Sequence, residues 1–523
     1  MSGPCQRSPG RTLSSSEGHS TRLSSILYVI CIEPLCHKIR SDPNIKGLQP
    51  PTPGPEIKLT AYADDNNPVV SDISSIKNVI NTATQFGLAS GGRLNLGKST
   101  GVLLGPAKQW SLPEKFCGIK WVPFSRVLGC RLGSCDISKE NWDRVSEKAE
   151  EAIESHKTRD LSLRGKAIII NSVVLSKLWY VGRIFLLPNN YLESLNTSIF
   201  KGFLWKSTEW IARETLYLKP SDGGIGLINI ELKLRAFRIL HIIDFLYGEW
   251  HPWKDLASYW ISMDLRGFRQ DLFTNASPHS SHKPDFYNTA VREFTDFQSK
   301  HPDLTLIGLT SKRVYEILLD DVNHQLRIVQ RNPTVDYISV FASCDDKLYC
   351  PQVRSLTYQI AHEVIRTRQR LHHFDSSRYR DDKCPSCRTK VESHDHLFYQ
   401  CPVTRDVWSV VQDIFYGLCN HRLRIDRMLV IYNLFPPLLT KSDLFIAKQV
   451  VGYAKLAIYD KRNKLVANKG HYNSQNLLYY FLYLLKSRVR ADNHRLPDRQ
   501  FKKLWCHKNV ICAKVGSTVE FCF

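Results

Sequence analysis

Two neighbouring carboxylates stand at the end of a short apolar stretch, Leu59-Thr60-Ala61-Tyr62-Ala63-Asp64-Asp65. The alternation before the acids is typical of a strand, and the acids themselves predict a tight turn at its tip. Carboxylates presented in this way can hold two Mg²⁺ ions, which clamp the attacking and leaving oxygens of a phosphoryl transfer. A solvated surface turn is the commoner explanation of an Asp-Asp pair, so the interpretation depends on further signals.

A group of cysteines and histidines in the last third of the chain has the spacing of a metal site. Two residues separate Cys384 from Cys387, eight separate Cys387 from His396, and four separate His396 from Cys401. Three thiolates and one imidazole suit a single tetrahedral Zn²⁺, and such a site contributes about 10–16 kcal/mol of binding free energy to local folding. His394 is the competing imidazole, and four unrelated buried side chains are the alternative explanation.

Basic and aromatic residues precede this cysteine group. Such a mixture suits phosphate contacts combined with base stacking, although a run of charges is also typical of a solvated helix face. A second basic stretch runs from Lys486 to Lys503. The candidate nucleic-acid-binding residues are Arg366, Arg368, Arg370, Arg378 and Arg380, with His372, His373, Phe374 and Tyr379 between them.

The charge of the whole chain favours a polyanionic partner. The 523 residues include 71 Lys and Arg against 50 Asp and Glu, a net charge of +21. Phosphates neutralised by such residues release counterions, which makes nucleic acid a better candidate than a membrane. The alternative is a soluble protein that is merely basic.

Neither a secretory signal nor a membrane span is predicted. The first 22 residues lack an apolar core, and the apolar run from Ala167 to Leu187 contains Asn171, Lys177 and Arg183, which indicates a buried helix. Fifteen scattered cysteines form no disulfide framework, so we expect a reducing compartment and no disulfide-linked partner. The expected location is the cytoplasm and nucleus, without a membrane partner.

The first quarter of the chain alternates strands and helices, which favours an α/β half-domain. Residues 1–22 are a low-complexity leader that we expect to be disordered, followed by a short helix from Leu23 that ends at Glu33-Pro34 or soon after. The return strand of the hairpin is predicted to be poor, because Pro68 cannot donate to the ladder. An amphipathic helix over 73–86, closed by Gly87 and Gly91-Gly92, precedes short strands at 102–104 and 127–129.

From Lys139 onward the pattern is helical. One helix is marked by residues 142–153, and Ser162 caps a second that runs towards Phe185 and stops at Pro188. A third helix covers roughly 191–205. The glycines of 223–227 form a turn, since they lack the spacing of a phosphate-binding loop, and the next helix ends near Tyr247. Residues 248–350, interrupted by prolines, predict a linker with some helices.

These motifs resemble, in the same order, the C-terminal part of the reverse transcriptase of LINE-type (non-LTR) retrotransposons. The resemblance covers about residues 23–245 and 355–523. Residues 23–36 are similar to the end of the template-contacting palm motif, 61–65 to the catalytic hairpin, 90–99 to the next palm motif, 127–129 to the primer-gripping strand, 161–180 to the thumb, 223–227 to a turn beyond it, and 384–402 to the zinc knuckle.

The resemblance implies an α/β partial palm, a mostly helical thumb and a helical C-terminal region with a zinc knuckle. It implies that Asp64 and Asp65 bind Mg²⁺, that Tyr62 and Ala63 shape the floor under the primer end, and that Lys98 lies near the triphosphate unless it is an exposed structural lysine. The implied partners are an RNA template and a DNA primer or target. The implied divisions are leader 1–22, palm 23–135, thumb-like region 136–247, linker 248–350, zinc-knuckle region 351–470 and basic segment 471–523.

One departure from the family concerns the metal site. In the family the hairpin acids share Mg²⁺ with a third aspartate on an earlier palm strand. Before Asp42 this sequence offers only Glu17 and Glu33. The fingers, the first half of the palm and an N-terminal endonuclease have no counterpart in these residues. Two metals need carboxylates from both strands, so we expect the hairpin alone to be half of a site.

Two interpretations therefore remain. The chain is either an RNA-directed DNA polymerase by descent, expected to be inactive as these 523 residues, or a non-catalytic zinc-dependent nucleic-acid-binding remnant. A zinc hydrolase or nuclease is disfavoured, because three thiolates and an imidazole close the metal sphere and no H-E-x-x-H occurs. Asp498, near Lys502, is better explained as an exposed turn than as a nuclease residue.

Overall fold

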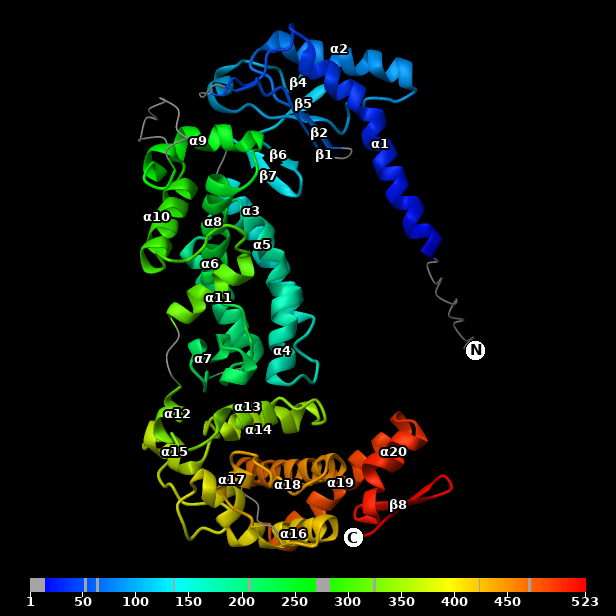
Figure 1. Cartoon of the computed structure of the whole chain (residues 1–523), viewed down its shortest axis with the longest axis vertical. Coiled ribbons are helices and arrows are strands. Elements are labelled where there is room, and N and C mark those ends of the chain that lie inside the picture. The colour runs from blue at the N-terminus through cyan, green and yellow to red at the C-terminus, as the bar shows by residue number, and fades with distance from the viewer. Residues whose placement is uncertain are drawn as a thin grey trace. The chain divides into compact units, whose positions relative to one another are not determined.

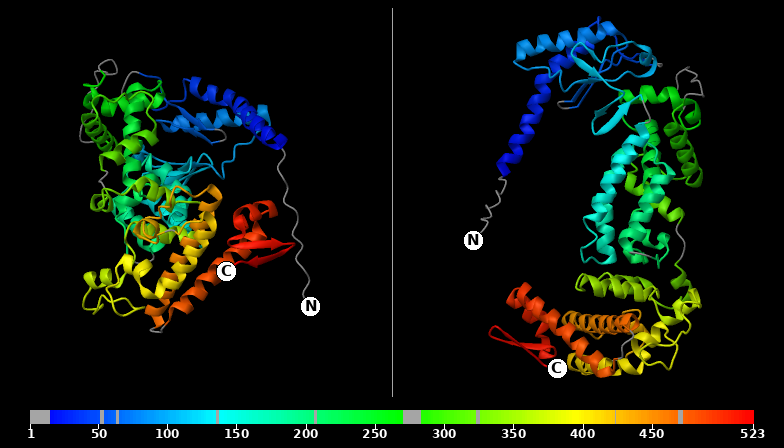
Figure 2. Two further views of the ribbon diagram at one scale, coloured as in Figure 1. Left: turned by 60° about the horizontal axis from the view of Figure 1, so that its bottom comes forward. Right: turned by 180° about the vertical axis from the view of Figure 1, so that it is seen from behind.

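A computed structural model describes residues 15–50, 54–62, 65–134, 137–205, 208–269, 283–322, 326–422, 424–468 and 472–523. The described chain is mostly helical, with short strands near its two ends (Figure 1, Figure 2). It divides into two compact units. Unit 1 comprises residues up to 147, 178–188 and 232–318, and unit 2 comprises 148–177, 189–231 and 319–523. Helices that cross a boundary are assigned below to the unit that holds most of their residues.

Unit 1 begins with helix α1 (Ser15–Ser41), which differs from the predicted segment at both ends. The backbone is already helical over 15–22, where a disordered leader was expected, and residues 1–14 lie outside the described range. The helix also continues through Pro34, because Cys36 and Ile39 beyond it pack into a small core with Ile45 and Leu59. Burial of this apolar face outweighs the hydrogen bond that proline removes.

Strands β1 (Leu59–Tyr62) and β2 (Asp65–Pro68) form the predicted antiparallel hairpin, with Tyr62 opposite Asp65. The expectation that Pro68 damages the return strand was wrong. The N–H of Val69 donates to the carbonyl of Lys58 (2.8 Å), so the next pair, Leu59 and Pro68, is a non-hydrogen-bonded pair. At that position no N–H is needed, and proline interrupts nothing.

Helix α2 (Ile73–Ser90) confirms the amphipathic stretch. The side chain of Asp72 caps its start by accepting from the Ser75 N–H (2.7 Å), and Ile76 and Val79 face the core. Gly91 ends the helix in the left-handed region (φ 75°), which glycine adopts at little cost. Gly87, also predicted to close the helix, lies within it.

The remaining strands of unit 1 are short. Strands β3 (Thr100–Gly101), β5 (Ile119–Trp121) and β4 (Lys115–Phe116) form a sheet in that order. Strands β6 (Phe124–Val127) and β7 (Cys130–Gly133) form a separate hairpin. Of the strand expected to open at 127–129, Val127 is the last residue of β6, whereas Leu128 (φ 47°) and Gly129 (φ 92°) form the turn of the hairpin, because both lie in the left-handed region that such tight turns require.

A helical layer completes unit 1. Trp142 of α3 is fully buried and its indole N–H donates to the carbonyl of Leu186 (2.8 Å). Gly182 allows α5 to approach α8, since a Cβ there would lie 2.3 Å from the side chain of Leu234. The helices are α3 (Ile137–Glu154), α5 (Ser176–Gly182), α8 (Ile230–Tyr247), α9 (Pro252–Leu265), α10 (Asp285–Lys300) and α11 (Ser311–Asp321).

The N-terminal part of unit 2 contains the predicted Ser162 cap, whose hydroxyl accepts from the Gly165 N–H (3.1 Å). The helix that follows changes to a π-type segment at η2 (Ile170–Val174). The 223–227 glycines form the predicted turn: a Cβ on Gly224 would lie 1.9 Å from the Leu218 carbonyl. The elements are α4 (Leu163–Ile169), α6 (Asn189–Thr197), η3 (Ser198–Leu204), α7 (Arg213–Tyr217) and η4 (Pro220–Asp222).

The rest of unit 2 is a helical assembly around α18 (Lys441–Asn468), the longest described helix. Ile446, Val450 and Ala454 on α18 are fully buried, and so is Lys455. Its neighbours include α14 (Pro351–Ala361), α16 (Arg405–Cys419), α19 (Ser474–Arg495) and α20 (Asp498–Trp505). Because other helices cover α18 on several sides, apolar residues occur all around it. The other elements are α12 (Arg327–Arg331), α13 (Tyr337–Cys344), α15 (Arg368–Phe374), η6 (His396–Gln400), η7 (Pro402–Thr404), α17 (Arg427–Val430), η8 (His507–Asn509), β8 (Cys512–Val515) and β9 (Thr518–Phe521).

Within the described ranges, none of the helices combines the length and apolar character that crossing a bilayer requires.

Candidate metal centre

Cys384 and Cys387 lie in a tight turn that brings their thiols together. The N–H of Cys384 donates to the Lys390 carbonyl and the N–H of Arg388 donates to the Cys384 carbonyl, both at 2.8 Å. Arg388 adopts a left-handed conformation (φ 60°), which reverses the chain directly after the second thiol. The sequence C-P-S-C-R therefore folds locally into the knuckle that its spacing predicts.

His396 and Cys401 reach the same point through a wide helical turn. Element η6 is of the π type, and the Cys401 N–H donates to the His396 carbonyl five residues earlier (2.8 Å). This i→i+5 closure places residues five apart on one side of the chain, which explains the four-residue spacer. The Ser393 hydroxyl accepts from the His396 N–H (3.1 Å) and fixes the start of the turn.

The four side chains form one cluster whose ligand atoms all lie within 4.8 Å of one another. The sulfurs of Cys384 and Cys401 are 4.0 Å apart, and the Cys387 sulfur lies 3.3 Å from His396 Nε2. A tetrahedron with Zn–S bonds of about 2.3 Å and a Zn–N bond of about 2.0 Å has edges of about 3.5–3.8 Å. The donor set therefore fits zinc in kind and in geometry.

The protonation of the cluster reflects this crowding. Hydrogen bonding with Cys401 lowers the pKa of the Cys384 thiol, and the same contact raises the pKa of Cys401. The pKa of His396 is raised, first by its hydrogen bond to Cys384. Three of the four residues are buried, at 1% exposure for Cys384, 2% for His396 and 3% for Cys401. Groups that share protons in this way are those that a metal would deprotonate.

His394, the competing imidazole, is not part of the cluster. Burial lowers its pKa to about 4, with Arg370 and Arg427 adding to the effect. It faces cations instead of thiols, so the structure selects His396.

Neighbouring side chains hold the knuckle in place. Thr389 donates its hydroxyl to the Cys387 sulfur (3.2 Å), and the hydroxyls of Ser386 and Tyr472 are hydrogen-bonded (2.8 Å). Glu392 pairs with Arg462 of α18 through two bonds of 2.6 and 2.9 Å, and it accepts the Arg368 N–H at 2.5 Å. Such outer contacts orient metal ligands.

The predicted nucleic-acid-binding arginines gather around aromatic rings. Arg366 lies over the Trp210 ring (4.7 Å) and Arg370 lies between Trp210 (5.8 Å) and Phe374 (5.6 Å). Arg368 and Arg378 both lie against Tyr379, at 5.7 and 5.6 Å, and Arg380 is exposed. Trp210 was missed by the sequence analysis, because no spacing signal connects it to residues more than 150 positions away.

The structure describes only part of the predicted polymerase site. Ala63 and Asp64 lie outside the described residues. Asp65 begins β2 opposite Tyr62, whose side chain is 69% exposed. Lys98 is exposed in a turn where its N–H donates to the Asn95 side chain (3.1 Å). Metal, primer and triphosphate contacts of these residues remain predictions.

Asp498 occupies the first turn of α20 and pairs with Lys502 (3.0 Å) and Lys514 (2.7 Å). Asp498 therefore begins a helix, where an exposed Pro-Asp turn was expected, and its carboxylate is ion-paired.

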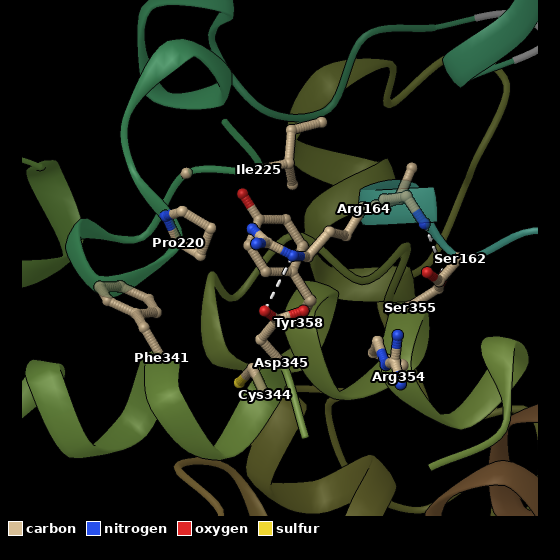
Figure 3. A pocket seen from close by; sticks show the side chains of 12 residues that line it. Ser162, Arg164, Pro220, Ile225, Phe341, Cys344, Asp345, Arg354, Ser355 and Tyr358 are labelled. Carbon is tan, nitrogen blue, oxygen red and sulfur yellow. Dashed lines mark hydrogen bonds and ion pairs between the residues drawn. The ribbon is translucent and has the colours of Figure 1, made fainter. Parts of the chain in front are cut away.

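A cavity beside α4 is shown in Figure 3. Its lining includes Arg164, Asp345 and Tyr358. Arg164 and Asp345 form an ion pair (2.9 Å). The Tyr358 hydroxyl donates to the Gly223 carbonyl (2.8 Å). Its volume is about 20 Å³, room for a single water molecule.

Comparison with known proteins agrees with these features. A family model described as zinc-binding in reverse transcriptase matches residues 312–408, which include all four cluster residues. The uncharacterized 149 kDa protein of transposon TX1 from Xenopus laevis is 30% identical over 257 residues, 48% of this chain. The match spans 19% of that protein, so the two share about a fifth of its length. The chain is thus similar over about half of its length to a transposon-encoded protein, and its residues 312–408 match a zinc-binding region of reverse transcriptases.

Proposed function

We propose that this chain is an RNA-directed DNA polymerase of a LINE-type retrotransposon by descent, and that its unit 2 binds nucleic acid through a zinc-loaded Cys384–Cys387–His396–Cys401 cluster. The cluster, inside the residues matched by the zinc-binding family, carries the proposal. Four protein ligands leave no open position, so the zinc is structural and not catalytic.

The metal acts by holding the arginine-rich segment 366–380. Zinc fixes the turn before Glu392, and Glu392 accepts the N–H of Arg368, at the start of α15. Arg366, Arg378 and Arg380 are exposed close to this point in the chain. They supply phosphate contacts, while Phe374, which is 66% exposed, offers a ring for a base.

For the polymerase site we propose that these 523 residues on their own do not extend a primer. Two-metal chemistry needs carboxylates on facing strands. In the described part of the chain β1 and β2 form a two-stranded sheet, without a third strand paired to them. If another polypeptide segment supplies the missing acid, Asp64 and Asp65 are the Mg²⁺ ligands, Tyr62 and Ala63 support the primer end, and Lys98 approaches the triphosphate.

The binding test uses the whole chain and a fluorescein-labelled single-stranded RNA 20-mer, followed by anisotropy. Arg366→Gln with Arg378→Gln and Arg380→Gln keeps the zinc ligands and removes three cations. We expect weaker binding and a slope of log K against log salt reduced by about 2, since each single-strand phosphate contact contributes about 0.7. An unchanged slope, with zinc still bound, would contradict the proposed surface.

The polymerase test supplies an RNA template, an annealed primer, dNTPs and Mg²⁺. We expect no primer extension. Extension that Asp64→Asn abolishes would show that the site is complete within this chain and would overturn the proposal of inactivity.

A further inference from the structure

One face of α19 carries exposed aromatic rings in line with cations. Tyr479 and Tyr483 are 67% and 63% exposed, and Lys486 and Arg490 follow them at intervals of three and four residues. Residues with this spacing share a helix face. The opposite face is the core face, where Leu477, Phe481, Leu485 and Val489 are fully buried. The exposed rings therefore are not needed for packing the helix.

Cations of α18 lie against Tyr480, a ring that neighbours Tyr483. Tyr480 stacks on Tyr483, with ring centroids 6.5 Å apart and planes 18° from parallel. Lys461 and Lys464 place their ammonium groups 4.9 and 4.8 Å from the Tyr480 ring. The Tyr480 hydroxyl donates to Asp460 (3.3 Å). A positively charged border thus flanks the aromatic stripe along the neighbouring helix.

The stripe continues at the other end of α19. The ammonium group of Lys486 lies 5.2 Å from the Phe521 ring and 5.3 Å from the Phe523 ring, and Arg490 lies 5.6 Å from Phe521. Residues 474–523 contain nine Lys and Arg against three Asp and Glu, and two of these acids, Asp492 and Asp498, are ion-paired. The local charge favours an anionic ligand.

A groove lies next to Tyr480, which stacks on Tyr483. Residues of α14, α18 and α19 line about 450 Å³, and the lining includes Asp460, which accepts the hydrogen bond of the Tyr480 hydroxyl. Gln352, Gln359 and Ser355 of α14 contribute amide and hydroxyl groups to the lining. Such groups can hydrogen-bond the edge of a base, and the volume lies in the range of ligand sites.

We propose that this α19 face, defined by Tyr479, Tyr483, Lys486 and Arg490 with the adjoining groove, is a stacking platform for single-stranded nucleic acid, separate from the Cys3His cluster. The proposal rests on nucleic-acid binding by unit 2. Exposed rings stack on bases of any sequence, while the cations track the phosphates. A duplex keeps its bases stacked inside and offers only phosphates, so the platform prefers single strands.

The experiment measures anisotropy of fluorescein-labelled U20, dT20 and a 20-base-pair duplex with the full chain. Tyr479→Ala with Tyr483→Ala removes the rings from an exposed helix face without opening the core. We expect affinity for both single strands to fall about tenfold or more, while duplex affinity stays unchanged. Tyr479→Phe with Tyr483→Phe keeps the rings and should bind as the unmodified chain does.

Tyr416→Ala is the matched control, because Tyr416 is also exposed (54%), on α16 of the same unit. Its substitution should leave all three affinities unchanged. If the α19 double variant binds U20 normally while the arginine variants of segment 366–380 lose it, the platform is refuted and the proposed function stands. If the unmodified chain binds none of the three probes, both proposals fail. An equal loss for duplex and single strands would refute stacking.

Discussion

Glu392 and Arg462 form a bidentate ion pair in which the side chains are 0% and 4% exposed. Glu392 follows the cysteine turn and Arg462 belongs to α18, so the pair ties the metal cluster to the central helix of unit 2. A buried pair adds little net stability compared with apolar residues, but breaking it leaves a charge without compensation.

Removal of one partner of this ion pair should therefore lower the free energy of unfolding strongly. We expect Arg462→Met to lower the free energy of unfolding of unit 2 by about 3–5 kcal/mol, since the Glu392 carboxylate would stay buried without its arginine partner and keep only the Arg368 N–H. Urea unfolding followed by tryptophan fluorescence measures the change. The comparison is Lys502→Met, which breaks the exposed pair with Asp498 and should cost less than about 1 kcal/mol. Equal effects of the two substitutions would contradict the anchoring role.

Zinc occupancy distinguishes the two histidines near the knuckle. We expect the purified chain to hold about one zinc ion, His396→Gln to lose most of it, and His394→Gln to retain it. Both substitutions replace an imidazole with an amide within three residues of sequence, so they control for each other. Metal analysis by mass spectrometry gives the ratio. Equal zinc content in the two variants would exclude His396 as the ligand.

Lys455 predicts a pH dependence of stability. Burial lowers its pKa from 10.5 to about 8, and its ammonium group donates to the Val430 carbonyl and the Asn433 side chain. Between pH 8 and 10.5 the unfolded chain holds a proton that the folded chain has lost. The free energy of unfolding should therefore rise with pH in this window by about 1.4 kcal/mol per unit, relative to Lys455→Met.

Urea titrations of the unmodified chain and Lys455→Met between pH 7 and 10.5 measure this difference, and the comparison cancels the contributions of buried tyrosines. Lys441→Met, at the exposed start of α18, serves as the control for replacing a lysine of the same helix by methionine. A difference between the chain and Lys455→Met that stays constant with pH would show that Lys455 titrates normally.

The register of the hairpin predicts which of its residues tolerates proline. Pro68→Ala should change the stability of the hairpin by less than about 0.5 kcal/mol, because the N–H at that position needs no partner. Asn67→Pro should destabilise it, since Asn67 and Thr60 form a hydrogen-bonded pair. Amide hydrogen exchange of Leu59 to Tyr62 reports both changes; the reverse order would mean a shifted register.

The sequence by itself determined the features that depend on neighbouring residues. The Cys384, Cys387, His396 and Cys401 spacing predicted the cluster, the alternation before Asp65 predicted the hairpin, and Ser162 and Gly91 marked helix ends. Each of these features depends on backbone geometry within a few residues, so the order of residues in the sequence is enough to predict it.

The tertiary structure decided the rest. Pro34 stays inside α1 because the residues beyond it find a core, Trp210 meets Arg366 across more than 150 positions, and Glu392 reaches Arg462 across 70. The choice of His396 over His394 also depends on which imidazole faces the thiols. Such contacts depend on the packing of segments that are distant in sequence. The free energy of this packing outweighs local conformational preference, and no periodic pattern in the sequence predicts the contacts.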